Sequence, residues 1–336
     1  MTVVVETPPL ETPFDIVRVA HVELFVSDLA ASRRFYVDLL GLHVTEESED
    51  ALYLRGVEEH HHHSLLLRKG DEAKVGHLSF LVRTPGCLEA LERHFAASGC
   101  SPAFVEGVEP GQGPALRVRD ELGFPLEFVH ELGQVESLLR RFHEHRGASI
   151  QRLDHFNFHV PDVQQAFRIL RGRGFRCSEF IATDPPDERL WAAWMYRKPD
   201  VHDVALMNGR GPRLHHVGFW VADTGSVLRA CDILAAAGER ARMERGPGRH
   251  GVSNAFFLYT RDPDGHRIEL YTSDYYTGDP DFVPLRWSAT DPQRGTFWGH
   301  RAPKSWFEES SLLAAEDGGT VPIRDPLLPV ITDTAS

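Results

Sequence analysis

The chain has few cysteines and no long apolar segment, and each shortage excludes a class of protein. Its four cysteines among 336 residues form no CxxC pair, which argues against a zinc knuckle and against a disulfide framework. No run approaches the roughly 18 apolar residues that span a bilayer, and the first residues lack the basic and apolar regions of a secretion signal. We therefore expect a cytoplasmic protein that is neither exported nor inserted into a membrane.

Basic residues are also in the minority. Lys and Arg number 36 against 49 Asp and Glu, which gives a formal net charge of −13. A surface for nucleic acid or anionic lipid would need a clustered excess of positive charge, so we expect neither partner and favour a small molecule. The hydrophobic content of 42% suits globular packing, and the length suits two ordinary domains.

One pattern of strand and helix occurs four times, beginning near Arg18, Val75, Arg152 and Leu214. Each copy combines a His-bearing strand, a turn, an amphipathic helix and a glycine stop. Alternating apolar segments with Gly and Asp-Gly turns follow, as in strands joined by tight connections. The sequence therefore predicts an α+β fold of four βαβββ modules in two tandem domains, each forming a curved sheet around a cavity.

The repeats also predict the domain boundaries. An extension covers 1–14, the first two modules cover 15–135, the last two cover 150–280, and a tail covers 281–336. The connecting segment 133–149 reads as a charged helix and a hinge. The tail contains three tryptophans, so we expect it to pack on the rest of the chain, where it could serve as a lid over a pocket.

Three residues recur at the same place in successive strands of the second half: His155, His216 and Glu269. Two imidazoles and one carboxylate form a facial triad that leaves part of the coordination sphere open, as in non-haem Fe(II) oxygenases. Mn(II) suits the same ligands. A single His at the start of a strand is more often part of the core, but three residues at repeated positions together favour a metal site.

Three further residues near the triad offer polar chemistry. His202 lies fourteen residues before His216 and could exchange protons, because an imidazole titrates near neutral pH. Tyr259 lies ten residues before Glu269, and this even spacing directs both to one side of a hairpin, where the hydroxyl could bond a phenolate. Asn157 shares the face of His155. Alone, each such residue is more often a packing or solvated side chain.

Five segments then resemble those of a known family. They are LDHFNFHVPDV (153–163), AAWMYRKPDVHDVAL (192–206), GPRLHHVGF (211–219), GPGRHGVSNAFFLYTRDPDGHRIELYTSDY (246–275) and TDPQRGTFWG (290–299). They are similar to segments of the extradiol ring-cleaving dioxygenases of the vicinal oxygen chelate superfamily, and the likeness covers nearly the whole chain.

This resemblance implies roles for particular residues. It implies Fe(II), with Mn(II) as the alternative, held by the His155, His216 and Glu269 triad, and His202 as the acid-base group. The residues that it places around substrate and oxygen are Asn157, Trp194 and Tyr259, and those that it places at the substrate's carboxylate or the pocket entrance are Arg245, His250 and Arg294.

The implied reaction is extradiol cleavage of a catechol by dioxygen, with 3,4-dihydroxyphenylacetate converted to 5-carboxymethyl-2-hydroxymuconate semialdehyde. The resemblance also implies a homotetramer. Where close relatives carry two consecutive arginines, this chain reads Arg294-Gly295, so the ring substituent stays open. Two alternatives remain: an isomerase or thiol transferase of the glyoxalase kind, and a non-catalytic binding protein of the bleomycin-sequestering kind.

The first half aligns with the second but differs around the triad. His21, His77 and Glu127 align with the three ligands, whereas Arg117 aligns with Tyr259 and Glu23 with Asn157. A cation beside a divalent metal is unfavourable, and Arg117 could pair with Glu127 or Glu23 instead. We therefore interpret the first half as a structural, non-catalytic duplicate.

The run His60–His63 lies in this half. His63 precedes His77 by fourteen residues, just as His202 precedes His216, so His63 aligns with the acid-base residue. Consecutive residues of a strand point to opposite faces, so four histidines in extended geometry cannot all reach one ion. We expect a polar strand edge, with adventitious nickel or zinc binding as the alternative.

Overall fold

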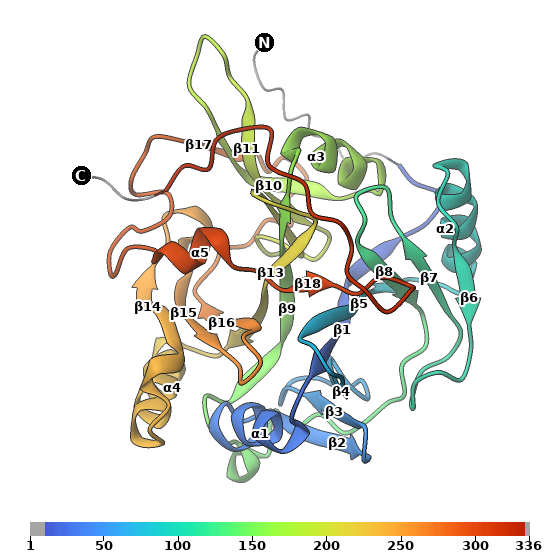
Figure 1. Ribbon diagram of the computed structural model, residues 1–336, viewed down its shortest axis with the longest axis vertical. Helices are drawn as coiled ribbons and strands as arrows, with labels where there is room; N and C mark the ends of the chain where they lie inside the picture. Colours follow the sequence, from blue (N-terminus) through green and yellow to red (C-terminus); the bar gives the residue numbers. More distant parts are fainter. Residues whose placement is uncertain (1–10, 333–336) are drawn as a thin grey trace.

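The computed structural model describes residues 11–332 and contains the four predicted βαβββ modules (Figure 1). The first module comprises β1 (Ile16–Val26), α1 (Leu29–Arg33), the π-helical turn η1 (Arg34–Leu39), β2 (His43–Glu47), β3 (Ala51–Arg55) and β4 (Leu65–Lys69). The second comprises β5 (Lys74–Val82), α2 (Gly86–Ala97), β6 (Ala103–Val105), β7 (Ala115–Arg119) and β8 (Pro125–Val129). Most of the expected extension 1–14 lies outside the described residues.

The second half repeats this order. The third module comprises β9 (Ile150–Val160), α3 (Val163–Gly172), β10 (Arg176–Ala182), β11 (Leu190–Tyr196) and β12 (Val204–Asn208). The fourth comprises β13 (Arg213–Val221), α4 (Thr224–Ala236), the short 3-10 turn η3 (Arg240–Arg242), β14 (Met243–Arg249), a second 3-10 turn η4 (Val252–Asn254), β15 (Phe256–Arg261) and β16 (Arg267–Thr272).

Three of the four module helices have an aspartate as the N-cap, immediately before the first helical residue. Asp28, Asp162 and Asp223 accept hydrogen bonds from backbone N–H groups in the first turns of α1, α3 and α4, which would otherwise lack partners. Helix α2 instead follows Pro85, which makes no side-chain cap. The aspartate turns of the repeat therefore fix where the strands end and the helices start.

Each half forms one mixed sheet in which the first strands of its two modules pair antiparallel at the centre. The first sheet runs β2-β3-β4-β1-β5-β8-β7-β6 and the second runs β14-β15-β16-β13-β9-β12-β11-β10-β17. The α+β fold with two curved sheets is thus confirmed. In Figure 1 the module helices lie at the periphery, and the two sheets meet where β1 approaches β9.

The two sheets share one core. Phe124 of the first half stacks on Phe158 of the second with ring centroids 4.1 Å apart, and Phe80 meets Phe156 edge to face. All four rings are buried. Burial of a Phe side chain contributes roughly 1.5–3 kcal/mol, so the halves stabilise each other across this contact.

The connection between the halves differs from its prediction. Within 133–149 the only helical turn is the 3-10 turn η2 (Phe142–Glu144), so the predicted charged helix is wrong. The backbone instead runs along the histidine segment: Val135 donates to the carbonyl of His60, and Leu138 to that of Val57. These bonds give the two backbone N–H groups their partners without a helix, and the Leu138 side chain is buried.

The histidine run is also not a regular strand edge. Only His61 forms an isolated bridge, with Gln134, and β4 begins after the run, at Leu65. His60 is exposed, whereas His63 is buried with its ring 4.7 Å from that of His21. The expected polar edge is therefore wrong for His63.

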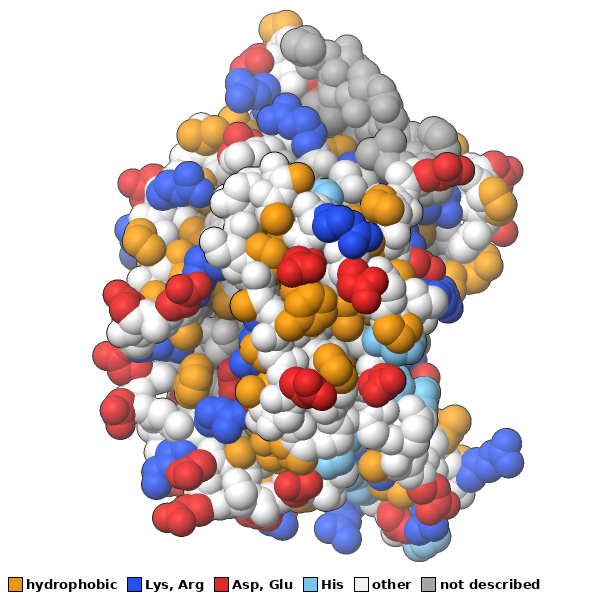
Figure 2. All heavy atoms as spheres, turned by 90° about the vertical axis from the view of Figure 1, so that its right-hand side faces the viewer, with side chains coloured by type: hydrophobic (Ala, Val, Ile, Leu, Met, Phe, Trp, Pro, Cys, Tyr) orange, Lys and Arg blue, Asp and Glu red, His pale blue; other side chains and the backbone are white. Residues whose placement is uncertain are grey.

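The tail packs on both halves, as predicted. Strand β17 (Leu285–Ser288) extends the second sheet beside β10, and β18 (Leu312–Leu313) joins the first sheet beside β5. Between them α5 (Lys304–Glu308) buries Trp306. The face in Figure 2 intersperses acidic and basic side chains and gathers no continuous basic patch. Within 11–332 no helix combines the length and apolar character needed to cross a bilayer.

Candidate metal centre and substrate pocket

The three predicted ligands converge in the second sheet. His155 comes from β9, His216 from β13 and Glu269 from β16, and these strands are adjacent in the order β16-β13-β9. Nε2 of His155 lies 3.2 Å from Nε2 of His216 and 3.0 Å from Oε2 of Glu269, and the His216 and Glu269 atoms are 3.1 Å apart. All three side chains are buried.

A glycine makes room for this convergence. Gly218 lies on the middle strand, opposite His155 on one side and Glu269 on the other. A Cβ atom at this position would lie 2.1 Å from Cε1 of His155, which no imidazole could tolerate without moving. The glycine thus lets a ligand ring lie across the strand between the two other ligands.

The donor set fits a divalent ion. Ligand atoms about 2.1 Å from a metal and at right angles to each other are separated by about 3.0 Å, as these three atoms are. Two imidazole nitrogens and one carboxylate oxygen suit Fe(II) and Mn(II) alike. Because the three atoms occupy one face, the opposite face is left for substrate.

Outer contacts fix the direction of both imidazoles. Nδ1 of His155 contacts Oδ2 of Asp154 at 3.1 Å, and Nδ1 of His216 contacts Nδ1 of His215 at 2.7 Å. Nε2 of His215 in turn faces the carbonyl of Trp306 at 2.9 Å. Each ring therefore directs Nε2 toward the centre, the arrangement by which outer partners orient metal-binding histidines.

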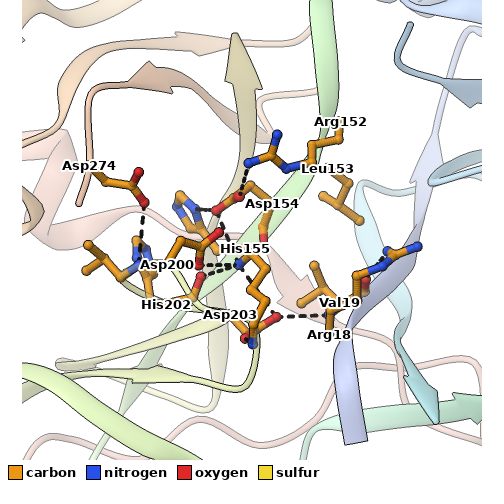
Figure 3. Close-up of polar contacts among 12 residues, drawn as sticks. Arg18, Val19, Arg152, Leu153, Asp154, His155, Asp200, His202, Asp203 and Asp274 are labelled. Atoms are coloured by element: carbon orange, nitrogen blue, oxygen red, sulfur yellow. Dashed lines mark hydrogen bonds and ion pairs between the residues drawn. The ribbon is translucent and has the colours of Figure 1, made fainter. Parts of the chain in front are cut away.

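Asp154 belongs to a network of charged side chains (Figure 3). Nζ of Lys198 lies 2.8 Å from the carbonyl of Asp154, 3.5 Å from its carboxylate and 2.5 Å from the carbonyl of His202. Asp203 accepts from the backbone N–H of Lys198, and its other oxygen accepts from that of Val19 in β1. The first half thus holds one edge of the metal centre.

Burial and charge set the protonation of the triad. Burial lowers the pKa of His155, but Asp154 and Glu269 outweigh it and raise this pKa to about 9. Burial lowers the pKa of His216 to about 4, although Glu269 opposes this. The two imidazoles hold the pKa of Glu269 well below its usual range against burial, so it is ionised. A bound ion therefore displaces a proton from His155.

The predicted acid-base and phenolate-binding residues lie beside the triad. The His202 ring lies 4.0 Å from that of His155. Burial and the charge of His155 lower the pKa of His202 well below its usual value, so it is neutral. Burial and Glu269 raise the pKa of Tyr259 well above 10, so its hydroxyl can donate. Asn157 lies opposite His216 in the sheet.

A pocket with about 680 Å³ of empty space opens onto this centre. Its walls combine polar groups with a large apolar area that includes Ile181, Trp191 and Ile331. Every predicted site residue except His155 lines it, so the structure brings together residues far apart in the sequence. Those residues are His216, Glu269, His202, Asn157, Tyr259, Trp194, Arg245, His250 and Arg294.

Cationic and hydrogen-bonding side chains lie where the tail closes the pocket. Arg245 donates to the carbonyl of Gly295 and to the hydroxyl of Thr296, each at 2.8 Å, and its guanidinium lies over the Trp306 ring. Nδ1 of His250 faces the same Gly295 carbonyl at 2.5 Å, and Nε2 faces the Tyr259 hydroxyl at 2.9 Å. The backbone at 295 therefore organises this wall.

Several supporting residues were missed from the sequence. The dipeptides Asp154-His155 and His215-His216 were a usable signal, since a polar neighbour often orients a ligand ring. Gly218 and Trp306 gave no such signal in the sequence, because their roles depend on close approach between segments that only the fold brings together. Lys198 followed a strand and looked like an ordinary loop cation.

Comparisons with known proteins agree with this geometry. The sequence pattern of the glyoxalase, bleomycin resistance protein and dioxygenase superfamily matches residues 18–128 and 152–270. The manganese-dependent 2,3-dihydroxybiphenyl 1,2-dioxygenase of Geobacillus genomosp. 3 is 32% identical over 84% of this chain and 94% of that enzyme. Metapyrocatechase of Geobacillus stearothermophilus is 30% identical over 91% and 97%.

Solved structures give a closer likeness. The anaerobic complex of Brevibacterium fuscum homoprotocatechuate 2,3-dioxygenase with 3,4-dihydroxyphenylacetate superposes with a TM-score of 0.91 at 47% identity, over 95% of this chain and 100% of that one. The chain belongs to the glyoxalase, bleomycin resistance protein and dioxygenase superfamily. Within that superfamily it is one of the extradiol ring-cleaving dioxygenases, as its motifs predicted.

Proposed function

We propose that the chain cleaves 3,4-dihydroxyphenylacetate beside its diol, with insertion of both atoms of dioxygen, to give 5-carboxymethyl-2-hydroxymuconate semialdehyde. No other reductant is needed, because the catechol supplies the electrons. The observation that carries this proposal is a His, His and Glu face that opens onto a pocket lined by His202, Tyr259 and three further basic side chains. The Brevibacterium fuscum enzyme that binds this catechol supports the choice of substrate.

His155, His216 and Glu269 would hold Fe(II), or Mn(II) as in the Geobacillus genomosp. 3 relative. When bound, the ion supplies a Lewis acid for the two diol oxygens and brings dioxygen to the same centre. The carboxylate and two neutral imidazoles leave one positive charge on the ion, which favours an anionic diol.

Three side chains act on protons and orientation. His202 is neutral and buried beside His155, and no partner is recorded for its Nδ1 among residues 11–332, so it can take up a proton from the substrate. The Tyr259 hydroxyl remains protonated and, on turning from Nε2 of His250, can donate to the diol oxygen that loses its proton. Asn157 offers an amide to the same side, since its Oδ1 also has no recorded partner there.

The ring substituent lies against the wall formed by Arg245, His250 and Arg294. A carboxylate there gains charge-assisted hydrogen bonds, whereas an unsubstituted catechol does not. Trp194 supplies an apolar surface for the ring. The carbonyl of Gly295 accepts a hydrogen bond from Arg245 and contacts Nδ1 of His250. Fewer N–H groups of this wall are therefore available to a substituent than two adjacent arginines would provide.

The test is a substrate panel with anaerobically prepared, Fe(II)-loaded enzyme. We expect kcat/KM for 3,4-dihydroxyphenylacetate to exceed that for catechol by at least about tenfold, because a charged hydrogen bond contributes roughly 1.5–3 kcal/mol. Equal values would show that the basic wall does not recognise the substituent. A preference for 2,3-dihydroxybiphenyl would show that the ring substituent binds at the apolar wall of the pocket and not at the basic one.

We further propose that residues 150–280 form the catalytic domain, 15–135 a non-catalytic domain, and 281–336 a tail that closes the pocket. Arg294, Trp306 and Ile331 of the tail line the pocket, which supports the last assignment. We also propose a cytoplasmic homotetramer. Four free cysteines and exposed apolar side chains such as Phe142 and Val283 support this proposal, and light scattering would test the assembly.

A further inference from the structure

A second set of ligand-type side chains converges in the first half. Nε2 of His21 lies 2.9 Å from Nε2 of His77 and 3.1 Å from Oε1 of Glu127, and the last two atoms are 3.7 Å apart. All three side chains are buried. These separations are close to those of the catalytic triad, and among residues 11–332 only these two groups of three converge in this way.

The same strands of the repeat supply both groups. His21, His77 and Glu127 lie on β1, β5 and β8, the counterparts of β9, β13 and β16. Ser79 lies opposite Glu127, as Gly218 lies opposite Glu269. The Ser79 hydroxyl donates to Oε1 of Glu127 at 3.1 Å, and this bond holds that oxygen at the centre.

Outer contacts orient these side chains as they do in a metal site. Nδ1 of His77 contacts Oε2 of Glu23 at 3.0 Å, which directs Nε2 of His77 toward the centre. Nε of Arg117 donates to Oε2 of Glu127 at 2.8 Å, so the other oxygen, Oε1, is the one presented. His21 differs: its Nδ1 has no hydrogen-bond partner among the described residues, so the contacts of its Nε2 with His77 and Glu127 are the ones that hold this ring.

Charge in this half also favours a cation. Three carboxylates, Glu23, Glu109 and Glu127, are paired with two guanidiniums, Arg68 and Arg117. With neutral imidazoles the net charge of these five groups is 2 − 3 = −1. The three carboxylates are buried whereas the two guanidiniums are partly exposed, so a further positive charge beside the carboxylates would be stabilising.

The hollow beside this centre differs in chemistry from the substrate pocket: its empty space of about 610 Å³ is lined by His77 and by the charged Glu23 and Arg117. Arg117 lies opposite Glu127 in the sheet, as Tyr259 lies opposite Glu269. Its guanidinium, with Arg68 and Glu109, occupies the side on which the second half has its substrate pocket. An ion here could therefore bind the protein without meeting a diol.

We propose that His21, His77 and Glu127 bind a divalent first-row transition ion that stabilises the first half and takes no part in ring cleavage. The buried His63 ring lies 4.7 Å from His21, and no partner is recorded for its Nε2 within 11–332, so it can supply a further nitrogen. A hollow with about 710 Å³ of empty space, lined by His60, His61 and His63, gives the ion a route inward. The competing occupant is a proton on His77, shared with Glu23 and Glu127.

The test counts metal in the full chain. Protein stripped with chelator is loaded with Zn²⁺, passed through gel filtration and analysed by mass spectrometry of the metal. We expect two ions per chain in the wild type, one in His216→Ala and one in His77→Ala. A His60→Ala/His61→Ala variant removes two exposed or half-exposed rings of the run and should still hold two ions, which would show that neither ring is needed for the second ion.

The location is tested independently by anomalous scattering at the zinc edge from crystals of the Zn²⁺-loaded wild type. A peak among His21, His77 and Glu127 is the expected result. One ion per chain in the wild type, with none in His216→Ala, would overturn the proposal and assign the missing charge to a proton. Because the wild type and His216→Ala decide the question, failure of His77→Ala to fold leaves the test intact.

Discussion

The two halves of the chain carry the same three ligand types on the same three strands, and each has a hollow beside them, but the side chains that line the two hollows differ. In the second half, Tyr259 and Asn157 border an open space, and Gly218 lets the His155 ring cross its strand. In the first half, Arg117 and Glu23 occupy the equivalent positions. The comparison teaches that a His, His and Glu face is not sufficient for this chemistry, and that the side chains lining the adjoining hollow decide the activity.

The largest effect is expected from the carboxylate ligand. Outer partners of metal ligands typically account for 10–100-fold in metal affinity, so Glu269→Gln should cost more than about 100-fold and abolish turnover. The matched change in the first half, Glu127→Gln, should leave turnover within about twofold, since any loss of metal affinity there would fall on a centre that meets no substrate. Oxygen uptake at fixed free Fe(II) measures both. Equal losses in the two variants would show that the halves share one catalytic site.

The acid-base residue should come next. His202→Asn should lower kcat by roughly 10²–10⁴-fold while metal content stays the same, because general acid-base catalysis contributes that much and His202 is not a ligand. His63→Asn, its counterpart, should leave kcat unchanged. Steady-state kinetics paired with metal analysis separate the two quantities. Unchanged kcat in His202→Asn would remove the residue from this role.

Gly218→Ala tests the space for the ligand ring. The new methyl group would collide with the His155 imidazole, so Fe(II) affinity should fall by roughly 10–100-fold, as for a disturbed outer partner. Ser79→Ala, at the equivalent position, adds no atoms and should not change Fe(II) affinity at the catalytic centre. Equilibrium dialysis against Fe(II) under nitrogen gives the affinities. A fully retained affinity in Gly218→Ala would mean that the ring can move aside at no cost.

The smallest effect is expected at the substituent wall. Arg245→Met should raise KM for 3,4-dihydroxyphenylacetate about tenfold through loss of a charged hydrogen bond, with kcat nearly unchanged. Arg117→Met in the first half should change neither constant. If the KM for catechol rose as much as that for the acid, Arg245 would be acting on the fold rather than on the substituent.

Much of this account could be predicted from the sequence because the fold is duplicated. The repeat indicated the four βαβββ modules. The spacing from His202 to His216 and from Tyr259 to Glu269, which recurs between the aligned residues of the first half, pointed to one cluster. The connection 133–149 was mispredicted as a helix, since charge and length resemble one, while its hydrogen bonds go to a distant segment. Local pattern cannot reveal such partners.

The same limit applies within the site. Nothing in the chain near Lys198 shows that it reaches the carbonyl groups of both Asp154 and His202, because this depends on how the loop after β11 meets strand β9. The buried position of His63 was likewise hidden in a run that looks uniformly polar. The three residues of the triad were predictable, and Asp154 and His215 could have been found as their sequence neighbours, whereas Lys198 and Gly218 were found only in three dimensions.

The most direct test of the central claim is oxygen uptake by Fe(II)-loaded enzyme on addition of 3,4-dihydroxyphenylacetate, measured for the wild type, His155→Ala and His21→Ala. We predict one dioxygen consumed per substrate, with a yellow ring-fission product, in the wild type and His21→Ala, and none in His155→Ala. Loss of uptake in His21→Ala with retention in His155→Ala, or no uptake by the metal-loaded wild type, would contradict the assignment of ring cleavage to the second half.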